Sequence, residues 1–419
     1  MNVEIVNTGS ELMLGRVLNT HQQWLCRRLA DLGHVVTRQV AIADTGSEIQ
    51  TAVREALSRA DLVITTGGLG PTSDDITREL IAELLGKKLI ANAEVLKHIE
   101  NFFTKRGRPR PQKTDVETFV PEGAQVFLNA TGTAPGLAMK VEPNHFRADK
   151  KPSWLVMLPG PPRELRPMFD ASVAPLLKQE FADEIFICRT LLTTGIGESR
   201  VQEFVEADLQ PFVQRGLEIG YCARPGAVDV RLVASGATAE KLTTEAEAVV
   251  QQILGESIFG RDDEEIENVV VKLLAQKKKT LALAESCTGG LLANRITDVP
   301  GASEFFLGGV VSYANSAKEK FLGVRAETLQ THGAVSEAVA REMALGARKK
   351  FNSDFAIAIT GIAGPSGGTA EKPVGTVFIA LASANGVEVK KFLNVWERAT
   401  FKQVTATQAL EWLRRTLSA

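Results

Sequence analysis

Two loops of this sequence combine nucleophilic or acidic side chains with glycines in patterns that suit hydrolysis. The first spans Ala284–Gly290, between an apolar run predicted to be a strand and a helix predicted from Thr288. A serine at such a turn faces a ligand, so Ser286 is the candidate nucleophile and Cys287 the alternative. The N–H groups that can stabilise an oxyanion or a phosphate there belong to Thr288, Gly289 and Gly290. The competing interpretation is that Ser286 only caps the helix.

The second loop spans Gly67–Asp75, between a strand predicted over Leu62–Ile64 and a helix predicted over Thr77–Leu85. It lacks the Gly-Lys-Ser/Thr of a Walker loop and the spacing of a dinucleotide fingerprint. Its glycines still allow the backbone to approach a phosphate closely, and the following helix begins with a positive dipole end. The candidate phosphate-binding residues are Gly67, Gly68, Gly70 and Thr72. The alternative is a tight turn in which Asp74 and Asp75 cap the helix.

Carboxylates elsewhere favour the binding interpretation. Glu11 follows the first predicted strand, Val3–Val6, and Asp44 follows the second, Val35–Ile42. Because the ends of parallel strands meet at one edge of a sheet, these side chains are expected beside Asp74 and Asp75. Oxygen ligands around a phosphate suit Mg²⁺ or a similar divalent cation. The candidate metal ligands are therefore Asp75, Asp44, Glu11 and Asp74.

Further candidates lie in the last third of the chain. Gly361 and Gly364 belong to a glycine-rich loop after the strand predicted over Phe355–Thr360. The loop contains a G-x-S-x-G sequence, but it leads into a strand and no histidine follows, so we interpret it as a ligand-binding loop rather than a nucleophile elbow. The remaining candidates are Tyr313, Lys318 and Arg398, which are also compatible with ordinary surface positions.

Composition narrows the classes of function. The chain has 419 residues, with 48 Lys and Arg against 50 Asp and Glu. There is no basic excess, so we expect no nucleic-acid partner. The N-terminus does not resemble a signal peptide and no apolar run approaches about 20 residues, so we expect no membrane partner. The four cysteines are scattered without a C-x-x-C pair, which favours a reducing, cytoplasmic location.

The pattern of elements predicts three α/β domains. Residues 1–178 alternate short β-branched runs with helical patterns, as a parallel sheet requires. In this region Ser47 is the predicted cap of the second long helix. Residues 179–260 are predicted to form a strand, a helix, two strands and a helix in this order, which makes a small α+β module. Residues 261–419 form a third α/β unit that ends in a long helix predicted over Thr400–Leu417.

Taken together, these motifs resemble those of the competence/damage-inducible protein A (CinA) family, over essentially the whole chain. The N-terminal part is similar to the molybdopterin-binding fold. The motifs that support the resemblance are Gly9–Leu12, Thr65–Thr72 with Asp74–Asp75, Thr133–Gly136, Leu158–Pro162, Gly195–Ser199, Ala284–Gly290, Pro300–Ser303, His332–Ser336, Thr360–Pro365 and Lys372–Thr376.

The resemblance implies two activities in the salvage of NAD breakdown products. The C-terminal domain would hydrolyse nicotinamide mononucleotide to nicotinate mononucleotide and ammonia, without a cofactor. The N-terminal domain would cleave ADP-ribose to AMP and ribose 5-phosphate with a divalent metal. The partners that the resemblance implies are these nucleotides. A homodimer is expected separately, because it is the commonest oligomeric state of soluble proteins. Two alternatives stay open, a molybdopterin-binding protein and a non-enzymatic competence or DNA-damage partner.

Family resemblance and residue chemistry together give a hypothesis for the amidase. Ser286 attacks the carboxamide carbon, and Lys318, kept partly neutral by burial, takes the hydroxyl proton. Tyr313 passes a proton to the departing ammonia, and Arg398 pairs with the phosphate.

Overall fold

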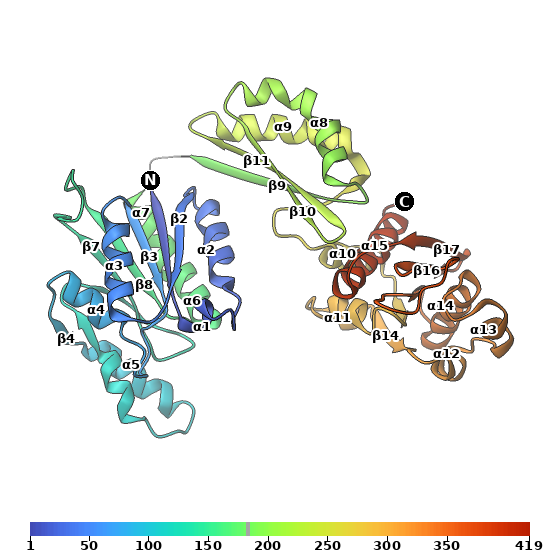
Figure 1. The fold of residues 1–419 in the computed structure, drawn as a ribbon, viewed down its shortest axis with the longest axis horizontal. Coiled ribbons are helices and arrows are strands. Elements are labelled where there is room, and N and C mark those ends of the chain that lie inside the picture. The colour runs from blue at the N-terminus through green and yellow to red at the C-terminus, as the bar shows by residue number, and fades with distance from the viewer. Residues whose placement is uncertain (182–184) are drawn as a thin grey trace. The chain divides into compact units, whose positions relative to one another are not determined.

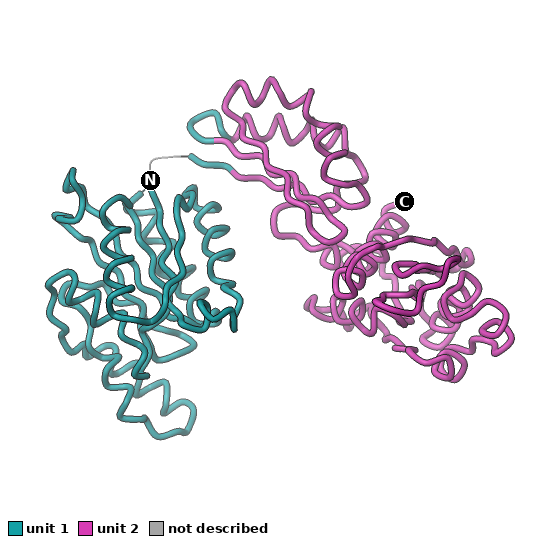
Figure 2. Tube along the Cα trace, viewed as in Figure 1, with its two compact units in different colours: residues 1–187, 235–239 teal, residues 188–234, 240–419 magenta. Residues whose placement is uncertain are grey.

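Each of the three predicted domains is built on its own β-sheet (Figure 1). The computed structural model describes residues 1–181 and 185–419. The chain forms two compact units (Figure 2), which consist of residues 1–187 with 235–239 and of residues 188–234 with 240–419. The predicted middle domain, 179–260, includes residues 182–184, which lie outside the described residues.

The N-terminal sheet has six strands. Across the sheet they are β2 (Val36–Ile42), β1 (Val3–Thr8), β3 (Leu62–Thr66), β8 (Ser153–Leu158), β7 (Gly136–Val141) and β6 (Gln125–Phe127). The first four are parallel, as predicted, whereas β7 and β6 are antiparallel additions at one edge. The carboxyl ends of β1, β2, β3 and β8 therefore share one edge, where we expect ligands to bind.

Helices cover both faces of this sheet. On one face α2 (Thr20–Asp31), α6 (Pro162–Met168) and α7 (Ala174–Glu180) pack against residues such as Ile5 and Ile64. On the other face α3 (Gly46–Leu57), α4 (Thr77–Leu84) and α5 (Ala93–Thr104) pack against Val6 and Val63. Successive strand residues point to opposite faces, which explains why β3 is buried along its whole length. The shorter elements are α1 (Ser10–Met13) and the paired strands β4 (Leu89–Ala91) and β5 (Phe119–Pro121).

Two local predictions in this domain are wrong. The cap of α3 is Thr45 rather than Ser47, and it makes no side-chain capping bond. The sequence also predicts a single helix from Glu164 to about Lys178, but a π-helical turn at Phe169–Val173 interrupts it, so that α6 and α7 are separate. Helix α6 has a proline in its first turn and Pro167 in its interior, and α7 has a proline in its first turn. A proline has no N–H to donate to the regular α-helical pattern.

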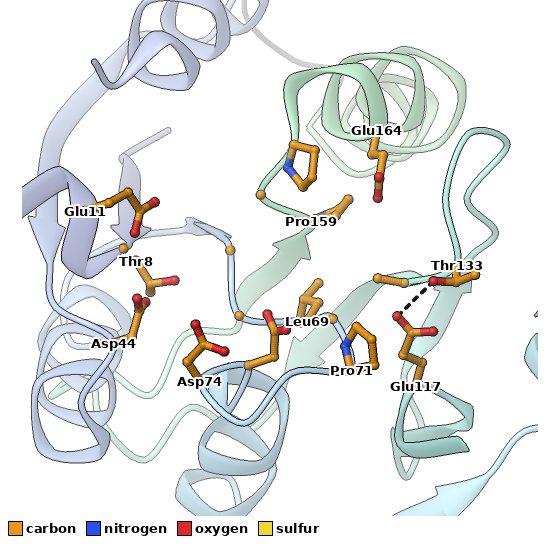
Figure 3. Close-up of a pocket in the computed structure, with 18 residues that line it drawn as sticks. Thr8, Glu11, Asp44, Leu69, Pro71, Asp74, Glu117, Thr133, Pro159 and Glu164 are labelled. Carbon is orange, nitrogen blue, oxygen red and sulfur yellow. Dashed lines mark hydrogen bonds between the residues drawn. The ribbon is translucent and has the colours of Figure 1, made fainter. Parts of the chain in front are cut away.

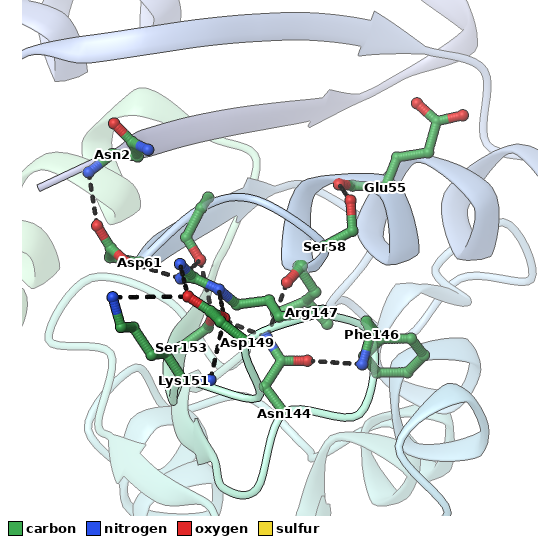
Figure 4. A network of polar contacts seen from close by, with 12 residues as sticks. Asn2, Glu55, Ser58, Asp61, Asn144, Phe146, Arg147, Asp149, Lys151 and Ser153 are labelled. Carbon is green, nitrogen blue, oxygen red and sulfur yellow. Dashed lines mark hydrogen bonds and ion pairs between the residues drawn. The ribbon is translucent and has the colours of Figure 1, made fainter.

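A polar network fixes the start of β8 (Figure 4). Asn144 donates to the Leu57 carbonyl at 2.7 Å and to Ser153 Oγ at 2.9 Å, and Arg147 forms a 2.7 Å ion pair with Asp61. Asp61 also accepts the Asn2 N–H at 2.8 Å. These contacts hold the amino ends of β1, β3 and β8 together, and so set the positions of the loops at their opposite ends.

The middle domain has the predicted order of strand, helix, strand, strand and helix, with one further strand. Its elements are β9 (Phe186–Thr194), α8 (Glu198–Val213), β10 (Glu218–Arg224), β11 (Ala227–Ser235), α9 (Ala239–Leu254) and β12 (Ile258–Arg261). The sheet order is β10-β11-β9-β12.

The C-terminal sheet has the order β14-β13-β15-β16-β17. Its strands are β13 (Leu281–Glu285), β14 (Phe306–Val311), β15 (Phe355–Gly361), β16 (Thr376–Ser383) and β17 (Gly386–Leu393). The first three in sheet order are parallel, and β16 and β17 are antiparallel. The loops after β13, β14 and β15 therefore lie at one edge.

Helices again form two layers. One face is covered by α10 (Ile266–Lys277), α11 (Leu291–Thr297) and α15 (Arg398–Ser418). The other is covered by α14 (Glu337–Phe351), together with residues from α12 (Asn315–Leu322) and α13 (Ala326–His332). Among the described residues, no helix is long and apolar enough to cross a bilayer.

Candidate functional site

In the C-terminal domain, the candidate residues lie at the shared edge of three parallel strands. Ser286 directly follows β13, Tyr313 follows β14 by one residue, and the glycine-rich loop follows β15. The Ser286 N–H donates to the Ile359 carbonyl at 3.0 Å, and the Ser312 N–H donates to the Glu285 carbonyl at 2.8 Å. These bonds extend the sheet by one residue on either side of β13, so the backbone holds Ser286 in place.

Lys318 lies against Ser286. Its Nζ donates to Ser286 Oγ at 3.1 Å and to the Ser312 carbonyl at 2.7 Å. Lys318 is on α12 and is 1% exposed, and burial lowers the pKa of its ammonium group because a low-dielectric environment disfavours the charged form. A buried amine beside a serine hydroxyl can take that hydroxyl's proton when the amine is neutral.

Cys287 has the opposite electrostatic character. It is buried, and burial raises the pKa of its thiol to about 12. The thiolate is the reactive form of cysteine, so this environment suppresses its nucleophilicity. Of the two nucleophiles that the sequence leaves open, the geometry favours Ser286.

Glu285, which the sequence did not mark as a candidate, organises the turn that contains Ser286. Its buried carboxylate accepts the N–H groups of Gly290 at 3.0 Å, Leu292 at 3.1 Å and Ala293 at 2.8 Å. It therefore closes the start of α11, which begins at Leu291 rather than at the predicted Thr288. The available signal was a carboxylate at the end of an otherwise apolar strand.

Glu285 also changes which donors are available to a ligand. The Gly290 N–H is bound to Glu285, and the Gly289 N–H donates to the Ser286 carbonyl at 3.1 Å. Ser286 itself is not the helix cap, because Gly290 occupies that position. Of the three predicted donors, only the Thr288 N–H has no backbone or carboxylate acceptor within the described chain. The Cys287 N–H has none either, and both N–H groups contact the Cys287 sulfur, a weak acceptor that a ligand oxygen can replace.

Tyr313 and Arg398 form the outer part of the site. Arg398 is the first residue of α15, and its guanidinium donates to the Tyr313 hydroxyl at 2.7 Å and to the Gly364 carbonyl at 2.9 Å. Both side chains are exposed. The Tyr313 hydroxyl thus contacts Arg398, whereas its carbonyl lies 3.4 Å from Lys318 Nζ. The structure brings Ser286, Lys318, Tyr313, Gly364 and Arg398 together.

Gly361 has a packing role at the end of β15. A Cβ there would lie 2.9 Å from the Thr376 carbonyl and from Val377, so only glycine fits beside β16. The loop after it leads into β16, as predicted, which agrees with rejecting the nucleophile-elbow interpretation of its G-x-S-x-G sequence.

The N-terminal domain has a pocket of about 360 Å³ at the carboxyl ends of its parallel strands (Figure 3). It is lined by the glycine loop and by the four predicted metal ligands, Glu11, Asp44, Asp74 and Asp75. The complete lining is Thr8, Gly9, Glu11, Asp44, Gly67, Gly68, Leu69, Gly70, Pro71, Asp74, Asp75, Glu117, Thr133, Ala134, Pro159, Gly160, Pro161 and Glu164.

Thr72 does not line this pocket but organises its acidic turn. Its hydroxyl contacts Asp74 and donates to Asp75 Oδ2 at 2.6 Å, and its N–H donates to the same oxygen at 3.0 Å. The Thr72 hydrogen bond lowers the pKa of Asp74. Asp74 and Asp75 do not cap α4, whose cap is Ile76.

The predicted metal ligands lie around one pocket but not around one point. Among the described residues, no group of three His, Cys, Asp or Glu side chains could hold a metal ion. Asp44 instead accepts the Ser10 N–H at 2.9 Å. The protein alone therefore provides no closed metal cage. Its hard oxygen donors fit an ion such as Mg²⁺, which is commonly held by one or two carboxylates together with substrate phosphates and water.

Glu117 is the second position that sequence analysis missed. It is fully buried, its Oε1 accepts the Thr133 hydroxyl at 3.0 Å, and its Oε2 has no partner in the described chain. Burial raises its pKa to about 7. No sequence signal marks it, because it lies in a short 3-10 segment, Gln112–Thr118, without a hydrophobic period.

The fold defines a protein of three domains, with one candidate site in the N-terminal α/β domain and another in the C-terminal α/β domain. Family models match residues 4–179 as a probable molybdopterin binding domain, 188–260 as the damage-inducible protein CinA KH domain, and 263–417 as the CinA C-terminal domain.

Relatives match the whole chain. A putative competence-damage inducible protein of Thermoanaerobacter pseudethanolicus is 43% identical, covering 100% of this chain and 98% of the relative. A CinA-like protein of Akkermansia muciniphila is 43% identical, covering 99% and 97%. The crystal structure of a competence/damage-inducible protein from Agrobacterium tumefaciens is 40% identical, covers 37% of this chain and 94% of its own, and gives a TM-score of 0.36. The chain belongs to the CinA family, as its motifs predict.

Proposed function

We propose that the C-terminal domain hydrolyses the carboxamide of nicotinamide mononucleotide to nicotinate mononucleotide and ammonia. The observation that supports this most directly is the 3.1 Å contact between Lys318 Nζ and Ser286 Oγ in a buried site. An amide is a poor electrophile, so its hydrolysis needs an activated nucleophile, an oxyanion site and a proton for the leaving amine.

The first chemical step uses the Ser286–Lys318 pair. Neutral Lys318 accepts the proton of Ser286 while Oγ bonds to the carboxamide carbon. The carbonyl electron pair moves onto oxygen, where the N–H groups of Cys287 and Thr288 stabilise it. When this tetrahedral adduct collapses, the carbon–nitrogen bond breaks and the proton held by Lys318 passes to the leaving ammonia, directly or through the Tyr313 hydroxyl, so that Lys318 is neutral again.

The second step releases the acid. Water attacks the resulting Ser286 ester with Lys318 as the base, and the Ser286–acyl bond breaks to give nicotinate mononucleotide. Arg398 binds the phosphate of the nucleotide, since a guanidinium with two of its five N–H groups engaged retains donors for an anion. No metal is required in this cycle.

The test is ammonia release from nicotinamide mononucleotide by the full-length protein in the presence of a chelator. We expect ammonia and nicotinate mononucleotide in equal amounts. A matched control is nicotinamide riboside, which lacks the phosphate and should be a weaker substrate. Absence of ammonia from nicotinamide mononucleotide would contradict the proposal.

We also propose a second activity, the metal-dependent cleavage of ADP-ribose to AMP and ribose 5-phosphate in the N-terminal pocket. The convergence of the glycine loop with Glu11, Asp44, Asp74 and Asp75 supports it. A divalent ion held by Asp75 with Asp44 or Glu11 would neutralise phosphate charge. The loop residues Gly67, Gly68 and Gly70 line the pocket in which the diphosphate would lie. Thr72 holds the two loop carboxylates in place.

The test is formation of AMP from ADP-ribose across several divalent metals. We expect cleavage that depends on the metal and is lost in Asp75→Asn. If no metal supports AMP formation, the N-terminal domain does not have this activity. Specific binding of molybdopterin would then favour the alternative function.

A further inference from the structure

The N-terminal pocket is rich in hydrogen-bond acceptors and has no basic side chain. Six of its lining residues are Asp or Glu. None of the lining residues that the structure describes is Lys, Arg or His. Ionised carboxylates only accept hydrogen bonds. A ligand of this pocket must therefore bring donors of its own, in addition to any metal ion that accompanies a diphosphate.

Glu117 differs from the other acidic residues of the pocket. Several of them already accept donors from the protein, as Asp44 does from Ser10 and Glu164 does from Asn129 Nδ2 at 2.8 Å. Glu117 is fully buried, yet its Oε2 has no partner within the part of the chain that the structure describes. A buried acceptor without a donor is unfavourable, so a ligand that supplies one gains affinity.

The position of Glu117 separates it from the predicted metal ligands. In Figure 3 its carboxyl group lies beside Pro71 and points toward Thr133, while Glu11 and Asp44 lie at the other end of the pocket. The Thr133 hydroxyl donates to Glu117 Oε1 at 3.0 Å, which orients the carboxyl group and leaves lone pairs of both residues for a ligand.

We propose that Glu117, oriented by Thr133, binds a ribose hydroxyl of the substrate and thereby selects sugar-containing diphosphates. The inference depends on the proposed cleavage of ADP-ribose and adds the part of the substrate that this end of the pocket recognises. In nucleotide-binding sites, a carboxylate commonly accepts hydrogen bonds from the ribose hydroxyls. The diphosphate then lies over the glycine loop, toward the other carboxylates.

Protonation suits Glu117 to this role. Because burial raises its pKa to about 7, part of the protein has a neutral carboxyl group at physiological pH. A neutral group adds no negative charge beside a diphosphate, and it can donate as well as accept a hydrogen bond.

The experiment compares full-length wild type with Glu117→Gln and Glu117→Met in ADP-ribose cleavage with Mg²⁺. The Gln side chain keeps an oxygen that can accept a hydrogen bond, whereas the Met side chain has a similar length but no such oxygen. We expect KM to rise about tenfold in Glu117→Met, the loss of roughly one hydrogen bond, and less than about threefold in Glu117→Gln. Values of kcat should change little. The matched control is Glu122→Gln, an exposed position outside the pocket.

Substrate analogues distinguish recognition of a ribose hydroxyl by Glu117 from a purely structural role of this residue. We use ADP-ribose that lacks the 2′-hydroxyl of the adenosine ribose, and ADP-ribose that lacks the 2-hydroxyl of the terminal ribose. For the analogue without the contacted hydroxyl, wild type and Glu117→Met should have equal kcat/KM, because the missing contact no longer distinguishes them. Thermal melts verify that each variant is folded.

The outcomes separate the inference from the proposed function. If wild type cleaves ADP-ribose and Glu117→Met has an unchanged KM, or loses the same factor on all three substrates, the inference is wrong and the activity stands. If wild type does not cleave ADP-ribose, the proposed activity is wrong and the inference fails with it.

Discussion

Burial acts on Lys318 and Cys287 in opposite chemical directions, and both effects favour serine chemistry. It lowers the pKa of the Lys318 ammonium group and so increases the neutral amine that can accept a proton. It raises the pKa of the Cys287 thiol to about 12 and so removes the thiolate. The same low-dielectric environment thus provides a base for Ser286 and leaves its neighbour unreactive.

The pH dependence of the amidase tests this assignment. Only neutral Lys318 accepts the Ser286 proton, so kcat/KM should rise with pH and level off above the Lys318 pKa. Because that pKa is lowered, the midpoint should lie below the ordinary lysine value of 10.5. The measurement is a pH–rate profile with nicotinamide mononucleotide.

Lys318→Arg provides the matching variant. Arginine stays protonated at every accessible pH, so we expect activity to fall by about 10²-fold or more. The control is Lys320→Arg, at an exposed position of the same helix. Near-normal turnover in Lys318→Arg would exclude Lys318 as the base.

Glu117 gives a residue-scale prediction for stability. Its folded-state pKa of about 7 lies above its ordinary value of 4.5, so its contribution to stability is fully present below 4.5 and is lost as pH rises through 7. Glu117→Gln should therefore stabilise the N-terminal domain at pH 8, by at most on the order of 3 kcal/mol. The gain should shrink toward pH 5. Denaturant unfolding at the two pH values measures this, and an equal effect at both would refute the raised pKa.

At the scale of elements, the turn after β13 depends on Glu285. Three N–H bonds to one buried carboxylate fix the start of α11 and the conformation of the loop that contains Ser286. Glu285→Ala leaves these donors unsatisfied and should destabilise the domain by about 2 kcal/mol. It should also lower kcat, because Ser286 and the N–H groups of Cys287 and Thr288 lose their alignment.

The control for Glu285 is Glu304→Ala, an exposed glutamate of the same domain. Unfolding curves and amidase rates are measured on both variants. If Glu285→Ala unfolds and reacts as the wild type does, the carboxylate does not organise the turn.

Sequence patterns predicted the elements with strong periodicity and missed those defined by tertiary pairing. The apolar runs of β1, β3 and β13 and the final helix, predicted over Thr400–Leu417 and observed as α15, were found because burial imposes a period on them. The antiparallel strand β7 was missed, since Gly136–Val141 pairs with β8 across a long loop and has no local signal. The start of α11 was placed too early, because no pattern reveals that Glu285 closes the helix.

The same distinction applies to the sites. Sequence reasoning placed Ser286, Asp44 and Asp75 correctly at strand ends, because topology determines which edge a loop occupies. The expectation that Lys318 is buried beside Ser286 came from the family resemblance rather than from a local pattern, and nothing in the sequence indicates that Thr133 orients Glu117. Those contacts depend on how helices pack against the sheet, which the order of residues does not show.

At the scale of the whole molecule, the two proposed sites belong to different compact units. Each is formed by strand ends of its own sheet, so we expect two independent activities. Ser286→Ala should abolish ammonia release and leave ADP-ribose cleavage unchanged, whereas Asp75→Asn should do the reverse. A chelator, like Asp75→Asn, should abolish ADP-ribose cleavage and leave ammonia release unchanged.

Rates for both substrates are measured on each full-length variant. Loss of both activities in either variant would show that the sites are coupled. Loss of amidase activity on chelation would show that the C-terminal chemistry also needs a metal.

The central claim is that Ser286 is the nucleophile of the amidase. The most direct measurement is ammonia release from nicotinamide mononucleotide by wild type, Ser286→Ala and Cys287→Ala. We predict that Ser286→Ala falls at least about 10³-fold, while Cys287→Ala stays within about tenfold because its buried thiol takes no part. An active Ser286→Ala together with an inactive Cys287→Ala would contradict the account.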